Sequence, residues 1–367
     1  MLPGQFYKPI FLYLVIILTL IQGSKMAPLS YTRIVHKKAS VFFSIILVLL
    51  LAWFLGSRPV SGYYFGDTAQ YAFMFENTVD GKITFAHGDG EWIWQYITVQ
   101  CARYLDVHEY FTVIAVLYIG FSLWACYRLT SNNTYTTFLF ILAGLSFFTY
   151  GTNGLRNGLA CSVVLLFLSY VNGGFIDKII AAVLAFVAYG IHHTTILPVS
   201  MAVISIFVIR SFKLAYTFWI ISILVSLVAG SAITSFFATL GFDDRLSYLS
   251  SAPSETAFTH TGFRWDFLIY SMMPIVLGYY IIYKRGIRDH FYEILLNTYT
   301  LSNAFWVMVI RANFSNRFAY LSWFMYPIVL AYPLLKIDIW GKYQGKYLNR
   351  IMLGQIGFTW FMQTFYW

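Results

Sequence analysis

Long apolar runs separated by short polar segments dominate the pattern of this 367-residue chain. Windows of about twenty residues, the length of helix that crosses about 30 Å of hydrocarbon, predict twelve membrane spans. We expect these spans to be helices, because a helix satisfies every backbone amide within its own segment. They are 5–22, 40–56, 109–127, 135–150, 155–171, 177–191, 194–209, 214–232, 266–283, 291–310, 317–335 and 349–366. The predicted fold class is all-α, a polytopic integral membrane protein in which residues 1–367 form one membrane domain.

Composition supports the membrane assignment. Hydrophobic residues make up 59% of the chain and charged residues 11%, whereas soluble chains average about 25% charged residues. The mean hydropathy is +0.67. Because so few charges cannot cover a soluble surface, a cytosolic enzyme, a disordered chain and a nucleic-acid-binding module are excluded as interpretations of the whole protein.

The basic residues predict an orientation. With the N-terminus outside, the inner loops hold fifteen of the 24 lysines and arginines and four of the 15 acidic residues, a net charge of +11. The outer face then carries a net charge of −2, as the positive-inside rule expects. The overall charge of +9 therefore reports topology, and it needs no nucleic-acid partner.

Two outer segments are predicted to be long, 57–108 and 233–265. Within the first, residues 91–105 (EWIWQYITVQCARYL) are too polar and too short for a span, and making them one would invert everything downstream. We expect this segment to lie on the outer surface or to be re-entrant. The three cysteines, Cys101, Cys126 and Cys161, stand far apart without any CxxC pair, so neither a zinc site nor a disulfide framework is expected.

Arginine is strongly preferred on the outer face. Seven of its nine basic residues are arginine: Arg58, Arg103, Arg156, Arg245, Arg264, Arg311 and Arg317. A charge near a helix end is costly unless it meets a partner or water, and the planar guanidinium suits phosphate better than lysine does. The arginines predict an outer anion site for a phosphate or pyrophosphate. The alternative is that each arginine snorkels or pairs locally, as Arg264 could with Asp266.

Polar residues gather around the first of these arginines. The outer segment SRPVSGYYFGDTAQYAFMFE supplies Arg58, Gly66, Asp67 and Tyr71. Asp67 can accept a proton from a hydroxyl or orient an arginine. The GD pair can instead be a turn that caps the following helix.

A second group, TYGTNGLRNGLA, places Arg156 where a span begins. A helix start offers unpaired amides and the positive end of a dipole, so an arginine there strengthens an anion site. The glycines of this group can also serve only close helix packing.

Two further groups complete the predicted site. His192 and His193 stand between apolar spans, and a histidine can remove a proton from a sugar hydroxyl without a metal; the alternative is a simple helix cap. Metal ligation is not expected, because neighbouring histidines point apart and no HExxH motif is present. The last group holds Arg311 and Arg317, with the outer-loop residues Arg245, Tyr248, His260, Arg264 and Asp266 as expected partners.

In this order the motifs resemble the EpsG/Wzy-like family of bacterial polysaccharide polymerases. They are an arginine followed by GD-x-x-x-Y after the second span, a glutamate opening the next outer helix, RNGLA at a helix start, H-x-T after an apolar span, and a late NRF followed by YP. The resemblance covers nearly the whole chain with short motifs. The matching positions are Arg58, Asp67, Tyr71, Glu91, Arg156, His192 and Arg317. His192 is preferred over His193 because Thr194 then fills the hydroxyl position of the motif.

The resemblance implies a glycosyltransferase of the bacterial inner membrane, with its active site facing the periplasm or exterior. Its substrates would be polyprenyl-pyrophosphate-linked oligosaccharide units, polymerised into O-antigen or exopolysaccharide. It implies His192, Asp67 and Arg156 as catalytic residues and Arg58, Tyr71, Glu91, Arg264, Arg311 and Arg317 as substrate-binding residues. No metal or cofactor is expected. A chain-length regulator and a flippase are the protein partners that such a pathway implies.

Two other classes of function stay open. An O-antigen ligase or a membrane acyltransferase would share the outer histidine and arginines. A flippase for lipid-linked oligosaccharides should place charges near midspan and show related halves, whereas the charges here collect at outer helix ends. Accumulation of single-unit glycolipid in a deletion strain distinguishes the polymerase from the ligase, whose loss removes all glycan from the lipid core.

Overall fold

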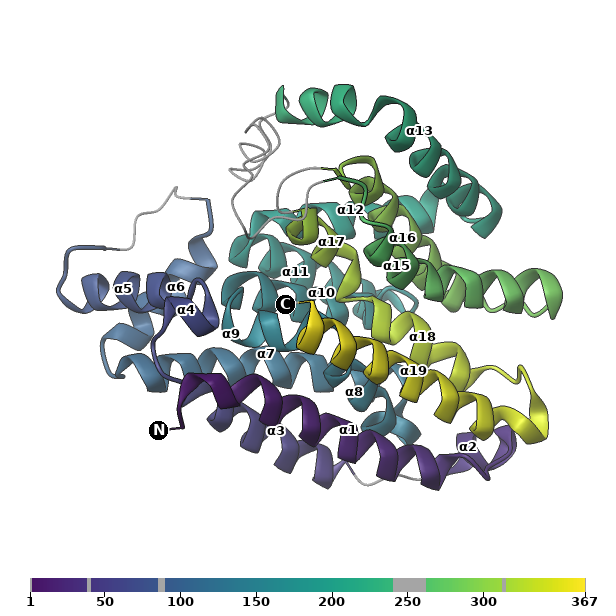
Figure 1. Ribbon diagram of the computed structural model, residues 1–367, viewed down its shortest axis with the longest axis horizontal. Helices are drawn as coiled ribbons and strands as arrows, with labels where there is room; N and C mark the ends of the chain where they lie inside the picture. The colour runs from purple at the N-terminus through teal and green to yellow at the C-terminus, as the bar shows by residue number, and fades with distance from the viewer. Residues whose placement is uncertain (1, 38–40, 85–89, 240–261, 312–314, 367) are drawn as a thin grey trace. The chain divides into compact units, whose positions relative to one another are not determined.

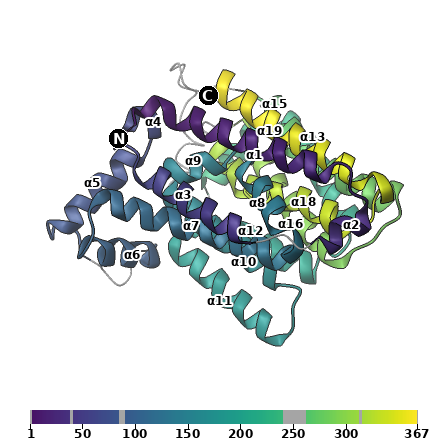
Figure 2. The ribbon, with the colours of Figure 1, turned by 90° about the horizontal axis from the view of Figure 1, so that it is seen from below.

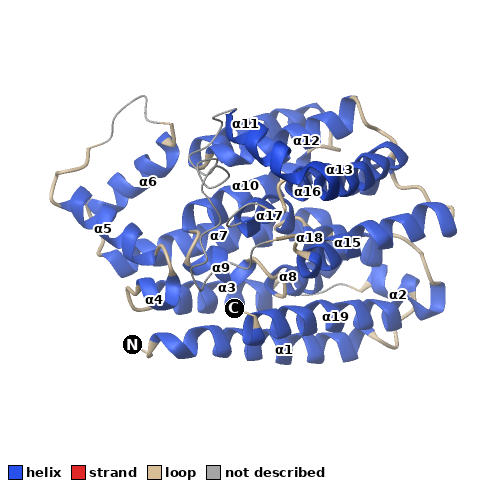
Figure 3. Ribbon diagram, turned by 45° about the horizontal axis from the view of Figure 1, so that its top comes forward, coloured by secondary structure: helices blue, strands red, loops and turns tan. Residues whose placement is uncertain are grey.

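The computed structural model describes residues 2–37, 41–84, 90–239, 262–311 and 315–366. Every regular element in these ranges is a helix, and none of them contains a strand (Figure 3). The predicted all-α class is therefore confirmed. The segment 91–105 forms a helix of 11 residues, α6 (Trp92–Ala102), about 17 Å long at 1.5 Å per residue. It is too short to span a membrane, as expected.

The chain divides into two compact units. The first comprises residues 1–195 and 331–367, and the second comprises residues 196–330. Compactness does not establish independent folding, so the single membrane domain stays a prediction. Each unit is described by itself below.

The first unit contains the elements that carry most of the predicted site. They are α1 (Tyr7–Met26), α2 (Tyr31–His36), α3 (Phe42–Gly56), α4 (Gly62–Phe65), α5 (Thr68–Val79), α6, α7 (Val107–Leu129), α8 (Thr134–Leu142), α9 (Phe147–Thr152), α10 (Leu155–Tyr170), α11 (Phe175–Ile191), the short η3 (His193–Thr195) and α19 (Gln344–Phe365). The predicted outer segment 57–108 thus folds mainly into α4, α5 and α6.

Helix α10 lies at the centre of the first unit. It packs against α7 and α11, α3 packs against α7, and α1 runs beside α19 (Figures 1 and 2). Nearly every side chain of α10 is buried, as expected of a helix that is apolar all round. The start of α7 is fixed by a capping box, in which Asp106 accepts from the Glu109 amide at 2.9 Å and Glu109 accepts from the Asp106 amide at 2.9 Å.

The predicted span 135–150 is wrong as a single helix, because it breaks between α8 and α9. Polar side chains of α19 replace the lost backbone bonds. Gln355 donates to the carbonyl of Phe140 at 2.8 Å, Thr359 to that of Ala143 at 2.7 Å and Gln363 to that of Leu145 at 3.2 Å. These donors stand four residues apart, on one face of α19. An interrupted helix is stable in apolar surroundings because neighbouring side chains satisfy its carbonyls.

The helix ends of the first unit separate two groups of charges. Arg128, at the end of α7, pairs with Asp177 at 3.1 Å and lies 3.6 Å above the ring of Tyr170. These residues belong to the predicted inner face. The predicted outer residues lie at the other ends of the same helices: Arg156 is at the start of α10, and His192 follows the end of α11. The two helices are joined by a short turn at residues 171–174 and run antiparallel, so Arg156 and His192 fall on the same side.

The second unit contains α12 (Ile196–Phe207), α13 (Phe212–Thr239), α15 (Trp265–Tyr279), the π-helix η5 (Tyr280–Lys284), α16 (His290–Met308), α17 (Ser315–Trp323) and the first part of α18 (Tyr326–Lys336). Helix α16 packs against α13 and α12. Asn303 of α16 links α13 to α17, because it accepts from the Trp219 indole at 2.9 Å and donates to the Ser322 hydroxyl at 3.0 Å.

The chain is a multi-pass membrane protein. In the described ranges five helical segments are long and apolar enough to cross a bilayer: Gly4–Met26, Val107–Leu129, Phe212–Gly230, Trp265–Lys284 and Asn316–Lys336. Three more, Phe42–Gly56, Leu155–Tyr170 and His193–Phe207, are apolar but shorter. The total of twelve spans stays a prediction, as does the orientation.

Candidate functional site

The nine predicted site residues fall into both units. Six belong to the first unit: Arg58, Asp67, Tyr71, Glu91, Arg156 and His192. Three belong to the second: Arg264, Arg311 and Arg317. Three of the first six form one contact cluster, which we call the Glu91 cluster: Glu91, Arg156 and His192.

Each member of the Glu91 cluster stands at the end of a helix. Glu91 is the N-cap of α6, Arg156 lies in the first turn of α10 and His192 follows the last residue of α11. Helix α6 packs against α11, which brings its first residue to the end of that helix. The three side chains converge because three helix ends meet on one side of the unit.

The Glu91 carboxylate bridges the other two residues. Its Oε1 contacts Nδ1 of His192, and its Oε2 contacts Nη1 of Arg156. The side chains are exposed to different degrees: 4% for His192, 17% for Glu91 and 35% for Arg156. Arg156 therefore forms the solvent-facing end of the cluster and His192 its buried end.

Electrostatics keep Glu91 ionised. Burial by itself raises the pKa of the Glu91 carboxyl, but the hydrogen bond to His192 and the nearby His192, Arg156 and His193 lower it more, so the net shift is downward. Since a carboxylate only accepts hydrogen bonds, the facing Nδ1 of His192 is its proton-bearing nitrogen. In the neutral imidazole, Nε2 is then the atom that accepts a proton.

The neighbouring histidine has a different partner. Nε2 of His193 contacts the carbonyl oxygen of Gly90, and its ring stacks on Tyr189 with centroids 4.6 Å apart. A carbonyl only accepts, so Nε2 of His193 carries the hydrogen. His192 thus holds the Glu91 side chain while His193 holds the backbone just before it. The HH pair in the sequence does not distinguish these two roles.

Arg58 lies inside the protein. It is 0% exposed, and it donates to the Leu55 carbonyl at 2.5 Å, to the Thr68 hydroxyl at 3.2 Å and to the Thr152 carbonyl at 3.3 Å. Its guanidinium also lies 4.4 Å from the centre of the Phe111 ring. Burial lowers the pKa of Arg58 to about 9, so it stays charged at neutral pH. The substrate-binding role of Arg58 stays a prediction, and sequence reasoning missed its partners Thr68 and Thr152.

The GD pair is attached to the same region. The amide of Asp67 donates to Oδ1 of Asn153 at 2.7 Å, and Asn153 precedes Arg156 by three residues. Gly66 has a φ of +54°, and a Cβ at this position would come within 2.6 Å of the Asn153 side chain, so glycine is required there. Asp67 occupies the N-cap position of α5, but its side chain accepts no capping bond. Asp67 is exposed to solvent.

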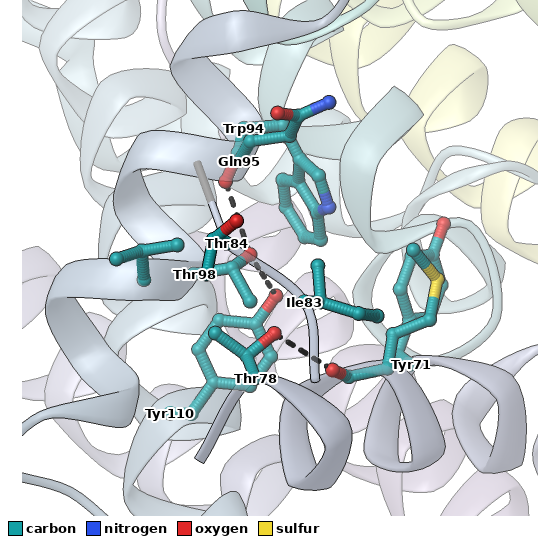
Figure 4. Close-up of a pocket in the computed structure, with 10 residues that line it drawn as sticks. Tyr71, Thr78, Ile83, Thr84, Trp94, Gln95, Thr98 and Tyr110 are labelled. Atoms are coloured by element: carbon teal, nitrogen blue, oxygen red, sulfur yellow. Dashed lines mark hydrogen bonds between the residues drawn. The ribbon is translucent and has the colours of Figure 1, made fainter. Parts of the chain in front are cut away.

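Tyr71 contacts the helix that begins after Glu91. Its ring packs edge-on against Trp94 with centroids 5.5 Å apart. Both rings line a pocket between α5, α6 and α7, together with Gln95, Thr98 and Tyr110 (Figure 4). The sequence offers no signal for this pocket, because Trp94 reads as one more interfacial aromatic residue.

The arginines of the second unit have local partners or an exposed position. Arg264 forms two bonds with Asp266, at 3.0 and 2.6 Å, and lies 3.6 Å from the centre of the Phe267 ring, which is the local pairing expected as the alternative. Arg311 is exposed, 5.8 Å from the ring of Phe263. Arg317 is half-buried in α17. Arg245, Tyr248 and His260 lie outside the described residues.

The comparisons identify a family. The family model described as "EpsG family" matches residues 40–366, so the chain belongs to the EpsG family, a membrane family implicated in exopolysaccharide biosynthesis. The resemblance seen in the motifs is thereby confirmed. No curated protein and no solved structure matches the chain.

Proposed function

We propose that this EpsG family member is a polymerase that joins oligosaccharide units carried on polyprenyl pyrophosphate, at the outer face of the bacterial inner membrane. The observation that carries the proposal is the bridge from Arg156 through Glu91 to His192. It brings together an anion-binding group (Arg156), a carboxylate (Glu91) and a proton acceptor (His192) at three helix ends on the same side of the first unit.

Arg156 is the group that we assign to the pyrophosphate. Its side chain is 35% exposed, and it stands in the first turn of α10, where unpaired amides and the helix dipole favour an anion. Glu91 holds the guanidinium in place until the substrate arrives. A pyrophosphate then competes with the carboxylate for Arg156 and gains charge stabilisation as it leaves the sugar.

His192 is our first candidate for the base. In the proposed step an acceptor hydroxyl oxygen attacks the anomeric carbon of the growing chain, and the bond from that carbon to the pyrophosphate oxygen breaks. Polyprenyl pyrophosphate leaves with the electron pair, and the hydroxyl proton passes to Nε2 of His192. Because the His192 side chain is 4% exposed, the acceptor hydroxyl has to enter the interior of the site to reach it.

Asp67 is the second candidate for the base. It is exposed, and its amide is tied to Asn153 near the start of α10. The two candidates make different predictions, since Asp67→Asn would leave the Glu91 cluster intact. If His192 is the base, that variant retains most of the activity.

The experiment that tests the function compares the host strain, a deletion strain and complemented strains by glycan banding. Polymerase loss leaves single repeat units on the lipid core, and the wild-type gene restores long chains. Complementation with His192→Ala or Arg156→Ala at equal membrane abundance should restore only single units. A deletion strain that lacks all glycan on its lipid core would instead indicate a ligase, and unchanged long chains would refute any role in polymerisation.

A further inference from the structure

A small pocket lies beside the Glu91 cluster on the same outer helix. Its walls come from α5, from the loop that follows α5, from α6 and from α7, and its volume is about 40 Å³. Figure 4 shows Tyr71, Thr84, Trp94, Gln95, Thr98 and Tyr110 around it. We propose that it binds the sugar ring that is linked directly to the pyrophosphate, so that it determines which repeat unit the protein accepts. This inference rests on the proposed function and adds the part of the substrate that the pocket recognises.

The floor of the pocket is aromatic and fixed. Trp94 is 4% exposed and Tyr110 is 1% exposed. The Thr98 hydroxyl lies 3.1 Å from the Tyr110 hydroxyl and donates to the Trp94 carbonyl at 3.0 Å, which holds these groups in place. A sugar ring carries C–H groups on its faces, and rigid aromatic walls with a few polar groups suit such a ligand.

The rim supplies hydrogen-bonding groups. The Gln95 amide and the Thr84 hydroxyl both line the pocket. Within the described part of the chain neither side chain has a hydrogen-bonding partner in the protein. Gln95 is half-buried and Thr84 is exposed, so both can reach a ligand at the mouth. An amide and a hydroxyl together offer the donors and acceptors that sugar hydroxyls need.

The position of the pocket relative to Glu91 determines which sugar it can hold. Trp94 and Gln95 follow Glu91 by three and four residues, so they lie on the same face of α6, about one turn or 5 Å along the axis. Glu91 contacts Nη1 of Arg156, which ties this arginine to the start of α6. A pyrophosphate held by Arg156 would therefore place its attached ring over this pocket.

The size of the pocket favours a ring substituent over a lipid chain. Since one water molecule needs about 10–15 Å³ by this measure, the pocket has room for a group of a few heavy atoms, such as a hydroxymethyl or acetamido substituent, with the ring across the mouth. A polyprenyl chain needs a long apolar groove. The threonines and the glutamine at this rim would leave such a chain next to unpaired polar groups.

The first test measures kinetics in lipid vesicles, with the single-unit glycolipid that accumulates in the deletion strain as substrate. Gln95→Leu keeps the size of the side chain and removes its hydrogen bonds. We expect it to raise KM about fivefold to tenfold, as the loss of one or two bonds predicts, and to change kcat much less. Gln100→Leu is the matched control, because Gln100 lies on the same helix, is absent from the pocket and, among the residues that the structure describes, accepts only from Arg103 at 3.4 Å. An unchanged KM for Gln95→Leu would overturn the proposal.

The second test does not depend on activity. Met74 lines the pocket and is 38% exposed, so Met74→Cys should react with a maleimide, while Cys101, Cys126 and Cys161 are buried. The same glycolipid should slow this labelling, and polyprenyl pyrophosphate without sugar should not. Equal protection by the sugar-free lipid would show that the pocket holds lipid. Polymerisation without protection would refute the pocket alone, and protection without polymerisation would refute the proposed function alone.

Discussion

Glu91 and His192, which are 101 positions apart in the chain, contact each other through carboxylate Oε1 and imidazole Nδ1. The other carboxylate oxygen contacts Arg156. One acidic side chain therefore joins a first-turn arginine of α10 to the histidine that follows α11. Because these contacts link segments far apart in the sequence, both stability and activity should respond to changes in Glu91.

Glu91→Gln should lower stability and alter its dependence on pH. The folded pKa of Glu91 lies below its ordinary value of 4.5, so its pairing contributes stability above that pH and loses it as the pH falls through the folded pKa. At neutral pH the substitution should lower the free energy of unfolding by about 1–3 kcal/mol. On acidification the variant should lose less stability than the wild-type protein does. Thermal unfolding of the variant and of the wild-type protein in detergent, between pH 7 and pH 3, measures both effects. Parallel pH profiles for the two proteins would show that the Glu91 carboxylate is not coupled to folding.

His192→Ala should stop chain elongation while the protein remains in the membrane. Loss of a general base usually costs about a hundredfold or more in rate. The measurement is glycan chain length at matched abundance, with Asp67→Asn as the comparison. Normal long chains in His192→Ala would leave this histidine as a helix-end residue and make Asp67 the better candidate.

His193 variants should separate hydrogen bonding from ring stacking. His193→Gln keeps an N–H that can reach the Gly90 carbonyl, whereas His193→Phe keeps the ring on Tyr189 without the donor. We expect the glutamine variant to retain more activity than the phenylalanine variant, and both to exceed His192→Ala. The contact to Gly90 would be irrelevant to the site if the phenylalanine variant equalled wild type in rate and in Tm.

Arg156→Lys tests the proposed pyrophosphate contact, and Arg317→Lys tests separately the substrate-binding role that the motif predicts for Arg317. Lysine keeps the charge and loses the planar fork, so activity should fall at least about tenfold at each position. Arg103→Lys serves as the control, because Arg103 is exposed and, in the described ranges, its side chain is bonded only to Gln100. Full-length polymer from both lysine variants would show that paired donors to pyrophosphate are not needed there.

Arg58→Met should chiefly destabilise the protein. It would leave the Leu55 carbonyl without its buried donor, while the Thr152 carbonyl would still accept from the Thr68 hydroxyl. An unsatisfied buried acceptor costs about 1–3 kcal/mol. The unfolding temperature of the purified variant measures this loss, and Arg58→Lys should recover part of it. An unchanged Tm combined with a raised KM would mean that Arg58 contacts substrate, as its place in the motif first suggested.

Single cysteines test the predicted orientation. Ser61→Cys should react with a membrane-impermeant maleimide in intact cells, and Ser24→Cys or Ser211→Cys should not, because the predicted inner face carries the basic excess. The native cysteines are buried, which keeps the background low. Labelling at residue 211 in intact cells would show that the predicted orientation is inverted, and it would remove the basis for a site on the outer face.

The sequence by itself determined the membrane class, the helical fold and the family. These follow from local properties: apolar runs the length of a bilayer, few charges and short motifs in order. It also singled out Arg156 and His192, since charged and titratable residues at the ends of apolar helices are costly and stand out, whereas Glu91 was indicated only by the family resemblance. It predicted 135–150 as one helix, because hydropathy does not register where a break is satisfied by donors from α19.

The tertiary structure alone decided how the singled-out residues are used. Arg58 and Arg156 are both arginines near helix ends on the predicted outer face, yet Arg58 is buried against carbonyl groups and Arg156 faces solvent. His192 and His193 differ only by which neighbour, Glu91 or Gly90, lies opposite each ring. Side-chain burial and hydrogen-bond partners depend on segments a hundred residues away, and no local pattern of residues encodes them.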